Sequence, residues 1–479
     1  MFYRRSPSMA AVFSFLLPGL GQLSLGAVRR GVLLASPAVA VFVAAIALAV
    51  GGRGAVLDTL LRADVLVALL VLNGVLAAYH VGAIADAYRL ASRLRVRRPA
   101  IRRASSVLLA GVLIVTLVLH GALEAIGYQA YQTLQSVFVP PEPGGAWTIP
   151  EPSLEDEPTP TAPSSPSASP IVTPRPSASA SPRPTPSPTP RWAADGRLNL
   201  LLIGSDAGAD RWSLRTDTII VLSVDVKTRR AALFGIPRNL VGVPLPPESA
   251  AAFTGGRFPG LINALYVYAM GHPNQFPGGD ARGFRAVTGA VQELVGVRLD
   301  AVVVVNLASF VRLVDAIGGL WINVPERLTD EHYPLEDGSG LIRLDIKPGC
   351  QRLDGRLALA YARSRHQDSD YGRMARQQAV LVALARQVDP MVLLPRVPRL
   401  LDIAKQNLWT TIRREDVRGL AELADRVNTA RVKTVLFVPS RYPSHLDSAE
   451  IAQIRHVVRS VFDGPWTGSS RPPAAPACP

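Results

Sequence analysis

Three apolar runs near the start of the chain are each long enough to cross a bilayer. They cover residues 32–50, 65–84 and 107–126. A helix needs roughly 20 apolar residues to span the hydrocarbon core. The backbone must satisfy its own hydrogen bonds in lipid, so these runs are predicted to be helices. Residues 1–128 are therefore expected to form a multi-pass α-helical membrane region.

Arginines beside these runs predict the orientation. The short segment 89–103 carries seven arginines, whereas the 51–64 loop balances two arginines with two aspartates. Positive loops stay in the cytoplasm, so three spans with a cytoplasmic N-terminus place everything after the third span outside the cell. The net charge of +14 is concentrated beside the apolar runs. A nucleic-acid-binding domain would instead cluster it on a soluble face, so no nucleic-acid partner is expected.

An earlier apolar run, residues 9–26, is interrupted by Pro18, Gly19 and Gly21 and has arginines on both sides. Like charge at both ends favours a re-entrant or interfacial hairpin over a span. His120 lies inside the third long run. It is either an interfacial residue or part of a polar relay.

The rest of the chain divides by composition. Residues 139–191 are dense in Pro, Ser and Thr, so an extended spacer outside the cell is predicted over 129–191. Residues 192–465 alternate apolar β-branched runs with helical patterns, which is typical of a layered α/β domain. Residues 466–479 form a C-terminal tail. Strands are expected at 198–204, 217–226, 230–238, 301–307, 320–325 and 432–439, and helices at 279–295, 309–319 (capped by Ser309), 354–363, 372–388, 396–406, 414–426 and 448–462.

The stretch 357–378 gathers five groups that suit an oxyanion: Arg363, Arg365, Arg373, Arg376 and Gln377. In an extended segment Arg363 and Arg365 would point the same way. The other three lie on one face of a helix that opens at Asp370, and its first turn would offer free N–H groups to a phosphate. Forked guanidiniums bind phosphate in a bidentate manner. The alternative is an ordinary solvated basic helix face.

Three more polar motifs lie at strand ends, at 204–206 (GSD), 215–218 (RTDT) and 236–238 (IPR). If the first two strands are antiparallel, Asp206 and Asp217 come to the same edge of the sheet. Carboxylates beside phosphate-binding arginines suit a hydrated Mg²⁺, which takes few protein ligands. Each motif alone is equally compatible with a turn aspartate or a surface ion pair.

Together these motifs resemble a known family. The order GSD, RTDT, IPR, INALY, VNLASFVRLVDAIGG, LDGRLALAYARSR and GRMARQQ, over about 199–388, is similar to the LytR-CpsA-Psr family of cell-wall glycopolymer ligases. The resemblance implies an α/β fold, a three-layer α/β/α sandwich with a central mixed sheet and an apolar pocket for a polyprenyl chain. It implies a Mg²⁺-dependent phosphotransferase that moves a glycopolymer from a polyprenyl diphosphate carrier to peptidoglycan. The expected partners are that lipid-linked glycan, the peptidoglycan acceptor and membrane lipid.

The resemblance also assigns roles to residues. Asp206 and Asp217 would lie near Mg²⁺, and Asp206 or Asp370 would take the acceptor proton beside Arg363 and Arg365. The diphosphate would be held by Arg215, Arg238, Arg363, Arg365, Arg373 and Gln377. The chain departs from the family pattern at Asn239, where Asp is common, at Leu261, where Lys is common, and at Gly208, where Arg is usual.

Two other functions fit the same motifs. One is a diphosphatase that releases polyprenyl phosphate to water, and the other is a non-catalytic scaffold that binds the lipid. The two cysteines, Cys350 and Cys478, form no metal-binding pattern. Because disulfides persist outside the cytoplasm, a Cys350–Cys478 bond is predicted, with two free thiols as the alternative.

Overall fold

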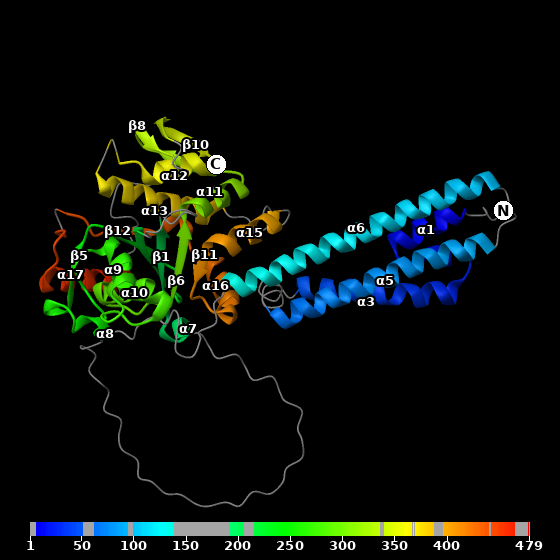
Figure 1. The fold of residues 1–479 in the computed structure, drawn as a ribbon, viewed down its shortest axis with the longest axis horizontal. Coiled ribbons are helices and arrows are strands. Elements are labelled where there is room, and N and C mark those ends of the chain that lie inside the picture. Colours follow the sequence, from blue (N-terminus) through cyan, green and yellow to red (C-terminus); the bar gives the residue numbers. More distant parts are fainter. Residues whose placement is uncertain are drawn as a thin grey trace, which may run out of the picture. The chain divides into compact units, whose positions relative to one another are not determined.

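The structure is a computed structural model of the chain (Figure 1). It describes residues 6–50, 62–93, 99–137, 191–205, 215–335, 340–365, 367, 369–387, 396–439, 442–464 and 478. The chain forms two compact units. The first contains residues 1–140, 311–319 and 388–426, and the second contains 141–310, 320–387 and 427–479. Most of the expected Pro-rich spacer, 138–190, lies outside the described residues.

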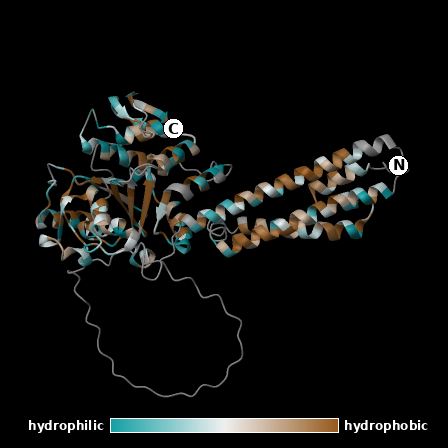
Figure 2. Cartoon of the chain, viewed as in Figure 1, coloured by the Kyte–Doolittle hydropathy of each residue, from teal (hydrophilic) through white to brown (hydrophobic). Residues whose placement is uncertain are grey.

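Long apolar helices dominate the first unit, as Figure 2 shows by their hydropathy. They are α3 (Val28–Val50), α5 (Ala63–Arg93) and α6 (Pro99–Val137). Stretches of all three are long and apolar enough to cross a membrane: Val28–Leu48, Ala63–Arg93 and Ser105–Gln135. The expectation that the spacer begins at residue 129 is wrong, because α6 continues to Val137. No proline interrupts the sequence between Pro99 and Pro140, so nothing breaks the helix at 129.

The expected hairpin at the N-terminus is present as two short helices, α1 (Pro7–Leu16) and α2 (Leu20–Ser24). Ser6 caps α1 by accepting from the N–H of Met9 at 3.2 Å. Gly19 has φ of 92° between the helices, and a Cβ there would lie 2.1 Å from the carbonyl oxygen of Gly31. Only glycine therefore permits this turn to pack so closely against α3. The depth of the hairpin in a membrane stays a prediction.

The first unit also contains a distant segment of sequence. It comprises α15 (Val397–Asn407), β11 (Leu408–Thr410), a 3-10 turn at Arg414–Asp416 and α16 (Val417–Ala424). Thr133 Oγ1 of α6 donates to the carbonyl of Leu401 at 3.3 Å, and Arg414 Nη2 donates to the carbonyl of Leu134 at 2.6 Å. The sequence analysis treated 192–465 as one domain and did not predict that part of it packs against α6. Local sequence patterns do not show which distant segment contacts Leu134.

A mixed sheet forms the centre of the second unit. Its strands are β1 (Arg197–Ser205), β2 (Thr216–Asp225), β3 (Ala231–Ile236), β6 (Ala301–Asn306) and β12 (Lys433–Leu436). They lie in the order β6-β1-β2-β3-β12. β2 is antiparallel to both neighbours, whereas β6 runs parallel to β1 and β12 runs parallel to β3. The prediction of a central mixed sheet is confirmed.

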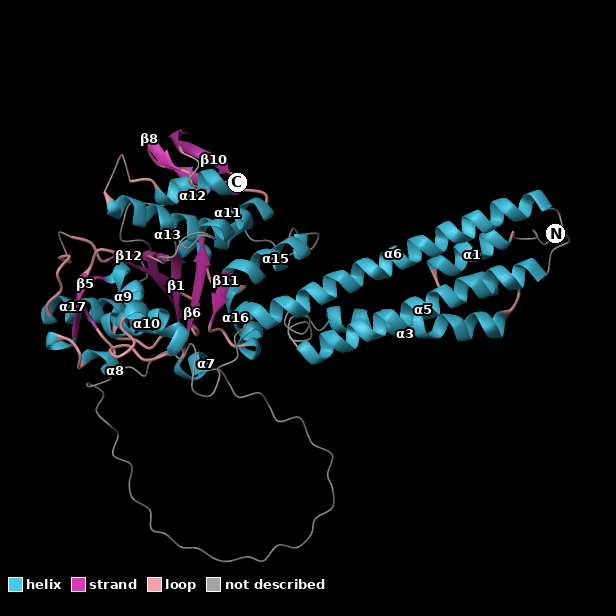
Figure 3. Ribbon diagram, viewed as in Figure 1, coloured by secondary structure: helices cyan, strands magenta, loops and turns pink. Residues whose placement is uncertain are grey.

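Helices cover both faces of this sheet (Figure 3). Phe234 of β3 is fully buried in a core that includes α10 (Arg282–Val295) and α17 (Ser448–Arg459). The next residue, Gly235, faces α13 (Asp370–Gln387), where a Cβ would lie 3.1 Å from Gln378 and from Met374. Successive side chains of a strand point to opposite faces. The α/β/α sandwich that the sequence predicted is therefore confirmed.

Several elements differ from the sequence expectations. Helix α11 (Leu307–Ala316) begins before Ser309, because Asn306 Oδ1 accepts from the N–H and hydroxyl of Ser309 at 2.8 and 2.7 Å. Asn306 is therefore the cap, and the assignment of Ser309 was wrong. Three two-stranded sheets lie outside the central sheet: β4 (Val241–Pro244) with β5 (Arg257–Leu261), β7 (Leu320–Val324) with β10 (Gly349–Leu353), and β8 (Leu328–Pro334) with β9 (Leu341–Ile346).

Helix α12 (Gly355–Arg363) has nine residues, and the remaining helices of the second unit are shorter. They are α7 (Arg191–Asp195), α8 (Pro247–Ala250) and α9 (Leu265–Gly271), with 3-10 turns at Thr254–Gly256, Ile262–Ala264, Gly279–Ala281, Thr429–Arg431 and Ser460–Phe462. Cys350 of β10 is bonded to Cys478, with Cα atoms 5.6 Å apart, which confirms the predicted pairing.

Candidate functional site

A cavity of about 550 Å³ opens where β1 ends and β2 begins. Antiparallel pairing places Ser205 opposite Thr216, so this end of β1 meets the start of β2 at one edge, as the sequence predicted. The lining residues come from β1, β2, the end of β3, α11, β8, α12 and α13: Gly204, Ser205, Asp217, Thr218, Arg238, Leu307, Asp330, His332, Tyr333, Pro334, Arg363, Ser364, Arg365, Asp370, Arg373 and Gln377.

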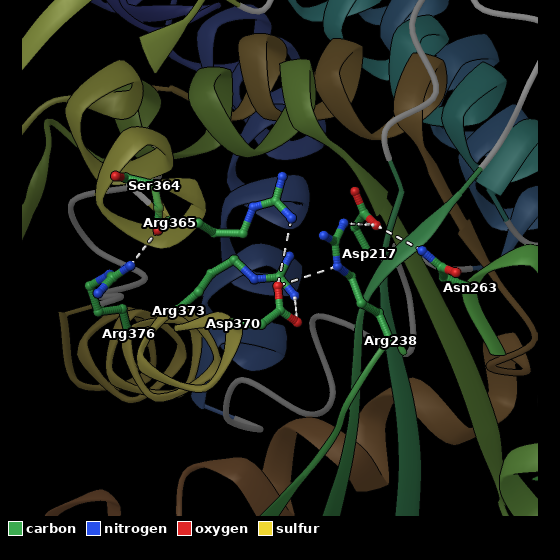
Figure 4. A network of polar contacts seen from close by, with 8 residues as sticks. All are labelled: Asp217, Arg238, Asn263, Ser364, Arg365, Asp370, Arg373 and Arg376. Carbon is green, nitrogen blue, oxygen red and sulfur yellow. Dashed lines mark hydrogen bonds and ion pairs between the residues drawn. The ribbon is translucent and has the colours of Figure 1, made fainter. Parts of the chain in front are cut away.

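Asp217 and Arg238 form an ion pair on the strand side of the cavity (Figure 4). Arg238 Nη1 donates to Asp217 Oδ1 at 2.7 Å, and the amide of Asn263 lies 3.5 Å from the same oxygen. Burial alone would raise the pKa of Asp217, but the hydrogen bond and charge of Arg238 outweigh it and hold that pKa below its usual value. Asp217 is therefore a carboxylate at neutral pH.

Asp370 joins the strand side to the helix side. It is the first residue of α13 and receives Arg373 Nη2 on Oδ2 at 2.9 Å. Arg238 Nε lies 3.4 Å from its Oδ1, and Arg365 Nη1 lies 3.8 Å from the same atom. Figure 4 shows the three guanidiniums converging on this carboxylate. The grouping of these four residues, predicted from motifs far apart in sequence, is present.

Arg373 is almost completely enclosed, with only 4% of its side chain exposed. Burial lowers its pKa from the ordinary value, the charges of Arg238 and Arg365 add to that effect, and Asp370 and Asp217 oppose it. Arginine begins from a pKa so high that it stays charged. Gln377, one turn further along α13, lines the same cavity. This face of α13 therefore presents the fixed positive charge of Arg373 and, one turn later, the neutral amide of Gln377.

Arg363 reaches the cavity by a different route from the one expected. It is the last residue of α12 and not part of an extended segment, so the argument from alternating side chains was wrong. Its guanidinium lies 5.9 Å from the centre of the Tyr333 ring, and its Nη1 is 3.4 Å from the Tyr333 hydroxyl. The aromatic ring thus holds the cation by a cation–π contact.

Arg376 belongs to the scaffold and not to the site. It donates through Nε to the carbonyl of Tyr361 at 2.7 Å and through Nη2 to the carbonyl of Ser364. Figure 4 shows it turned toward Ser364, away from the other arginines. The sequence grouped it with Arg373 because both lie within one turn of α13. Its role is to satisfy carbonyls at the C-terminal end of α12, where no intrahelical donor remains.

Strand β8 contributes cavity residues that sequence reasoning missed. Asp330, His332, Tyr333 and Pro334 line the cavity, and Asp330, only 6% exposed, accepts from the Ser364 hydroxyl at 2.8 Å. The strand LTDEHYP is short and mostly polar, so nothing in it marks a strand or a site. A Tyr beside a His in a polar run was the available signal.

Two expected site residues are not among the described lining residues, for different reasons. Asp206 lies outside the described residues, as does Gly208. Arg215 is exposed just before β2 and is not among the lining residues. The departures at Asn239 and Leu261 also fall beyond the cavity lining, and Leu261 is 44% exposed.

The charges and oxygen atoms at the cavity suit an anion with a divalent cation. Four arginines face three aspartates among the lining residues, so the sum is one positive charge. Within the described ranges, no three His, Cys, Asp or Glu side chains lie close enough to hold a metal by themselves. The buried Ser205 hydroxyl, which lines the same cavity as Asp217, has no hydrogen-bond partner among the described residues. A hydroxyl and a carboxylate are oxygen ligands that suit Mg²⁺, which needs few protein ligands when phosphates supply others.

Similar sequences and structures were found for the part of the chain that carries these motifs. Biofilm regulatory protein A of Streptococcus mutans is 25% identical over 220 residues, which are 45% of this chain and 50% of that protein. The polyisoprenyl-teichoic acid–peptidoglycan teichoic acid transferase TagV of Bacillus subtilis is 26% identical over 259 residues, 52% of this chain and 60% of that protein. The chain thus spans about half the length of the curated relatives it matches.

The crystal structure of Bacillus subtilis TagV is similar with a TM-score of 0.41 and 22% identity, over 56% of this chain and 98% of that one. The profile of the LytR_cpsA_psr family matches residues 170–450, which include every arginine and aspartate of the cavity. Because this match extends over more than half of the sequence, the chain belongs to the LytR_cpsA_psr family.

Proposed function

We propose that the protein is a membrane-anchored phosphotransferase, which moves a glycopolymer from a polyprenyl diphosphate carrier onto peptidoglycan outside the cell. The observation that carries the proposal is the convergence of Arg238, Arg365 and Arg373 on Asp370 in the lining of one cavity. A diphosphate needs several guanidiniums in fixed positions. The curated relative TagV, named as a transferase of teichoic acid, supports this reading.

The arginines bind and orient the diphosphate. Arg373 is rigid because it is buried and held by Asp370, and Arg238 is fixed by Asp217. Arg365 is 52% exposed and can turn from Asp370 toward an incoming phosphate. Arg363 and Gln377 also line the cavity. Charge that develops on phosphate oxygens in the transition state is stabilised by such preorganised donors.

The reaction forms one bond and breaks one. An acceptor hydroxyl oxygen of peptidoglycan attacks the phosphorus that carries the glycan, and the bond from that phosphorus to the bridging oxygen breaks. Polyprenyl phosphate leaves with the electron pair, and the hydroxyl proton passes to a carboxylate. Asp370 is already ion-paired with three arginines, which favours a positioning role for it and leaves Asp206 as the expected proton acceptor.

Mg²⁺ belongs to the proposal as a resident ion. When bound, it would neutralise negative charge on the phosphate oxygens. Asp217 and the Ser205 hydroxyl would hold it, together with Asp206 by family resemblance. The apolar pocket for the polyprenyl chain, also implied by the resemblance, stays a prediction.

The test uses the full chain in liposomes, with a synthetic polyprenyl diphosphate glycan as donor and purified peptidoglycan as acceptor. The expected result is glycan bound covalently to peptidoglycan, with polyprenyl phosphate released in equal amount. Release of polyprenyl phosphate at the same rate without peptidoglycan would instead identify a diphosphatase. Donor binding without turnover, with or without Mg²⁺, would identify a scaffold. Either result would overturn the proposal.

A further inference from the structure

A chain of polar side chains joins three helices of the first unit at the level of the apolar spans. His80 and Asn73 belong to α5, His120 and Glu124 belong to α6, and the carbonyl of Phe15 lies at the end of α1. Polar groups in a span are costly and mark sites of function. The cavity chemistry does not use these residues, so they need a separate explanation.

The first contact fixes one proton. His80 Nε2 lies 3.0 Å from the carbonyl oxygen of Phe15. A carbonyl oxygen only accepts, so His80 Nε2 must carry a hydrogen and donate it. The contact satisfies a carbonyl in the last turn of α1, where intrahelical donors run out.

The far end of the chain fixes a second proton. Asn73 Nδ2 lies 3.0 Å from the carbonyl oxygen of His120 and 2.8 Å from Glu124 Oε2, so the amide nitrogen donates to both. This leaves Asn73 Oδ1 facing His120 Nδ1 at 2.8 Å. Turning the amide over would place its oxygen against two acceptors. His120 Nδ1 must therefore donate to Asn73.

The two rings also face each other. His80 Nδ1 and His120 Nε2 are 3.4 Å apart, and the rings are nearly perpendicular, with an interplanar angle of 84°. A hydrogen bond there needs one proton between the two nitrogens. Hydrogen bonds at all three contacts need three ring protons, whereas two neutral imidazoles carry two.

We infer that His80 and His120 form a proton-binding site within the membrane helices, and that this arrangement is its protonated form. Glu124 supplies the counter-charge through Asn73. An ionised carboxylate so placed favours the cationic state of the pair. When the third proton leaves, one of the three contacts is lost, so proton binding is linked to the packing of α5 against α1 or against α6.

Neighbouring charges do not replace Glu124 in this role. The described helix α1 carries no titratable side chain. On α5, Tyr79 donates to the carbonyl of Leu34 in α3, and Asp86 is paired with Arg30 and accepts from Gln22 of α2 at 3.0 Å. Asp86 is six residues from His80, about 9 Å along the helix at about 1.5 Å per residue. Asp86 is thus already neutralised by its own arginine, whereas Glu124 is hydrogen-bonded into the histidine chain.

Other groups on α6 and on the helix packed against it lie further away. Tyr128 and Tyr131 follow Glu124 by one to two turns. Helix α15, which carries Arg399 and Asp402, meets α6 at Thr133, more than two turns beyond Glu124. The carboxylate next to the histidine pair is therefore Glu124.

The test is nitrogen NMR of the full chain in lipid nanodiscs, with histidine rings labelled with ¹⁵N. The chain contains seven histidines, and His80→Gln and His120→Gln identify the two ring spectra. We expect the spectrum of the unaltered protein to show one ring protonated on both nitrogens. Glu124→Gln should lower the pH midpoint of that signal by about one unit. Glu422→Gln on α16, a carboxylate exposed to solvent, should leave it unchanged.

Two neutral rings in the unaltered protein, from about pH 5 to about pH 8, would overturn the proposal and leave a purely structural clamp. An unchanged midpoint in a folded Glu124→Gln protein would overturn the assigned counter-charge. Replacing the five other histidines with glutamine leaves only these two rings in the spectrum, so the test does not depend on folding of the His80 and His120 variants. Glycan transfer is not the readout, so the outcome is independent of the proposed function.

Discussion

Arg373 Nη2 and Asp370 Oδ2 are 2.9 Å apart, one turn from each other at the start of α13, with Arg373 only 4% exposed. An acid in the first turn stabilises a helix through its dipole. Here Asp370 also fixes the buried guanidinium of Arg373 in the cavity lining. Removing Asp370 would leave the buried Arg373 cation without the carboxylate that it contacts, which is strongly destabilising. Variants of more exposed arginines are therefore the clearer probes of phosphate binding.

Arg365→Ala should reduce glycan transfer about 100-fold, because a charge-assisted contact to phosphate contributes about 2–4 kcal/mol in the transition state. The side chain is 52% exposed, so the melting temperature should change little. The measurement is the initial rate of transfer in liposomes. Arg327→Ala, which removes a similarly exposed arginine paired with Asp345 outside the cavity, is the control. Equal rates for both variants would exclude Arg365 from the site.

Arg376→Ala should destabilise the second unit by about 1–3 kcal/mol, because the carbonyls of Tyr361 and Ser364 lose their donor. Urea unfolding of the protein, followed by tryptophan fluorescence, measures this. Arg376→Lys should recover only part of the loss, since lysine lacks the fork that reaches two carbonyls. A variant as stable as the original chain, but inactive, would place Arg376 back among the phosphate ligands.

Asp217 should contribute to stability in a pH-dependent manner. Its folded pKa lies below the ordinary value of 3.8, owing to Arg238. The contribution is therefore present above about pH 4 and is lost as the pH falls through the lower folded pKa. Asp217→Asn should flatten the acid limb of the unfolding curve, and Glu422→Gln should not. An identical acid limb in the Asp217 variant would show that the ion pair with Arg238 adds no stability.

Breaking the Cys350–Cys478 bond should lower stability by about 2–4 kcal/mol, since it removes a link across 128 residues of sequence. The comparison is thermal unfolding of the protein with and without reductant, with the Cys350→Ser and Cys478→Ser double variant as the control that no reductant affects. Peptide mapping without reduction identifies the bond directly. Two alkylatable thiols in the native protein would contradict the pairing.

The orientation in the membrane is tested by labelling. In a Cys350→Ser, Cys478→Ser background, a Ser167→Cys change in the spacer should react with an impermeant thiol reagent in intact cells. A Ser92→Cys change at the end of α5 should react only after lysis, because the arginines of segment 89–103 retain it in the cytoplasm. The reverse pattern would invert the topology.

The sequence was sufficient for the features that follow from local pattern. Apolar length predicted α3, α5 and α6, and short apolar runs predicted the strands β1, β2 and β6, because a segment buried on all sides has a continuous apolar sequence. Antiparallel pairing of β1 with β2 then placed Asp217 at the edge where the cavity opens. The arginines of 363–373 stood out because the stretch 357–378 contains no lysine and a forked guanidinium suits phosphate.

Only the tertiary structure decided which of those groups converge. Arg373 and Arg376 are equivalent by helical position, yet one turns to Asp370 and the other to the carbonyl of Ser364. Asp330 and His332 reach the cavity from a strand that no local pattern marked. The proton count of His80 and His120 depends on the atoms that face them from α1 and from Asn73. The spacing of apolar residues shows which face of a helix or strand is buried. The partner of a polar side chain depends instead on packing between segments far apart in sequence.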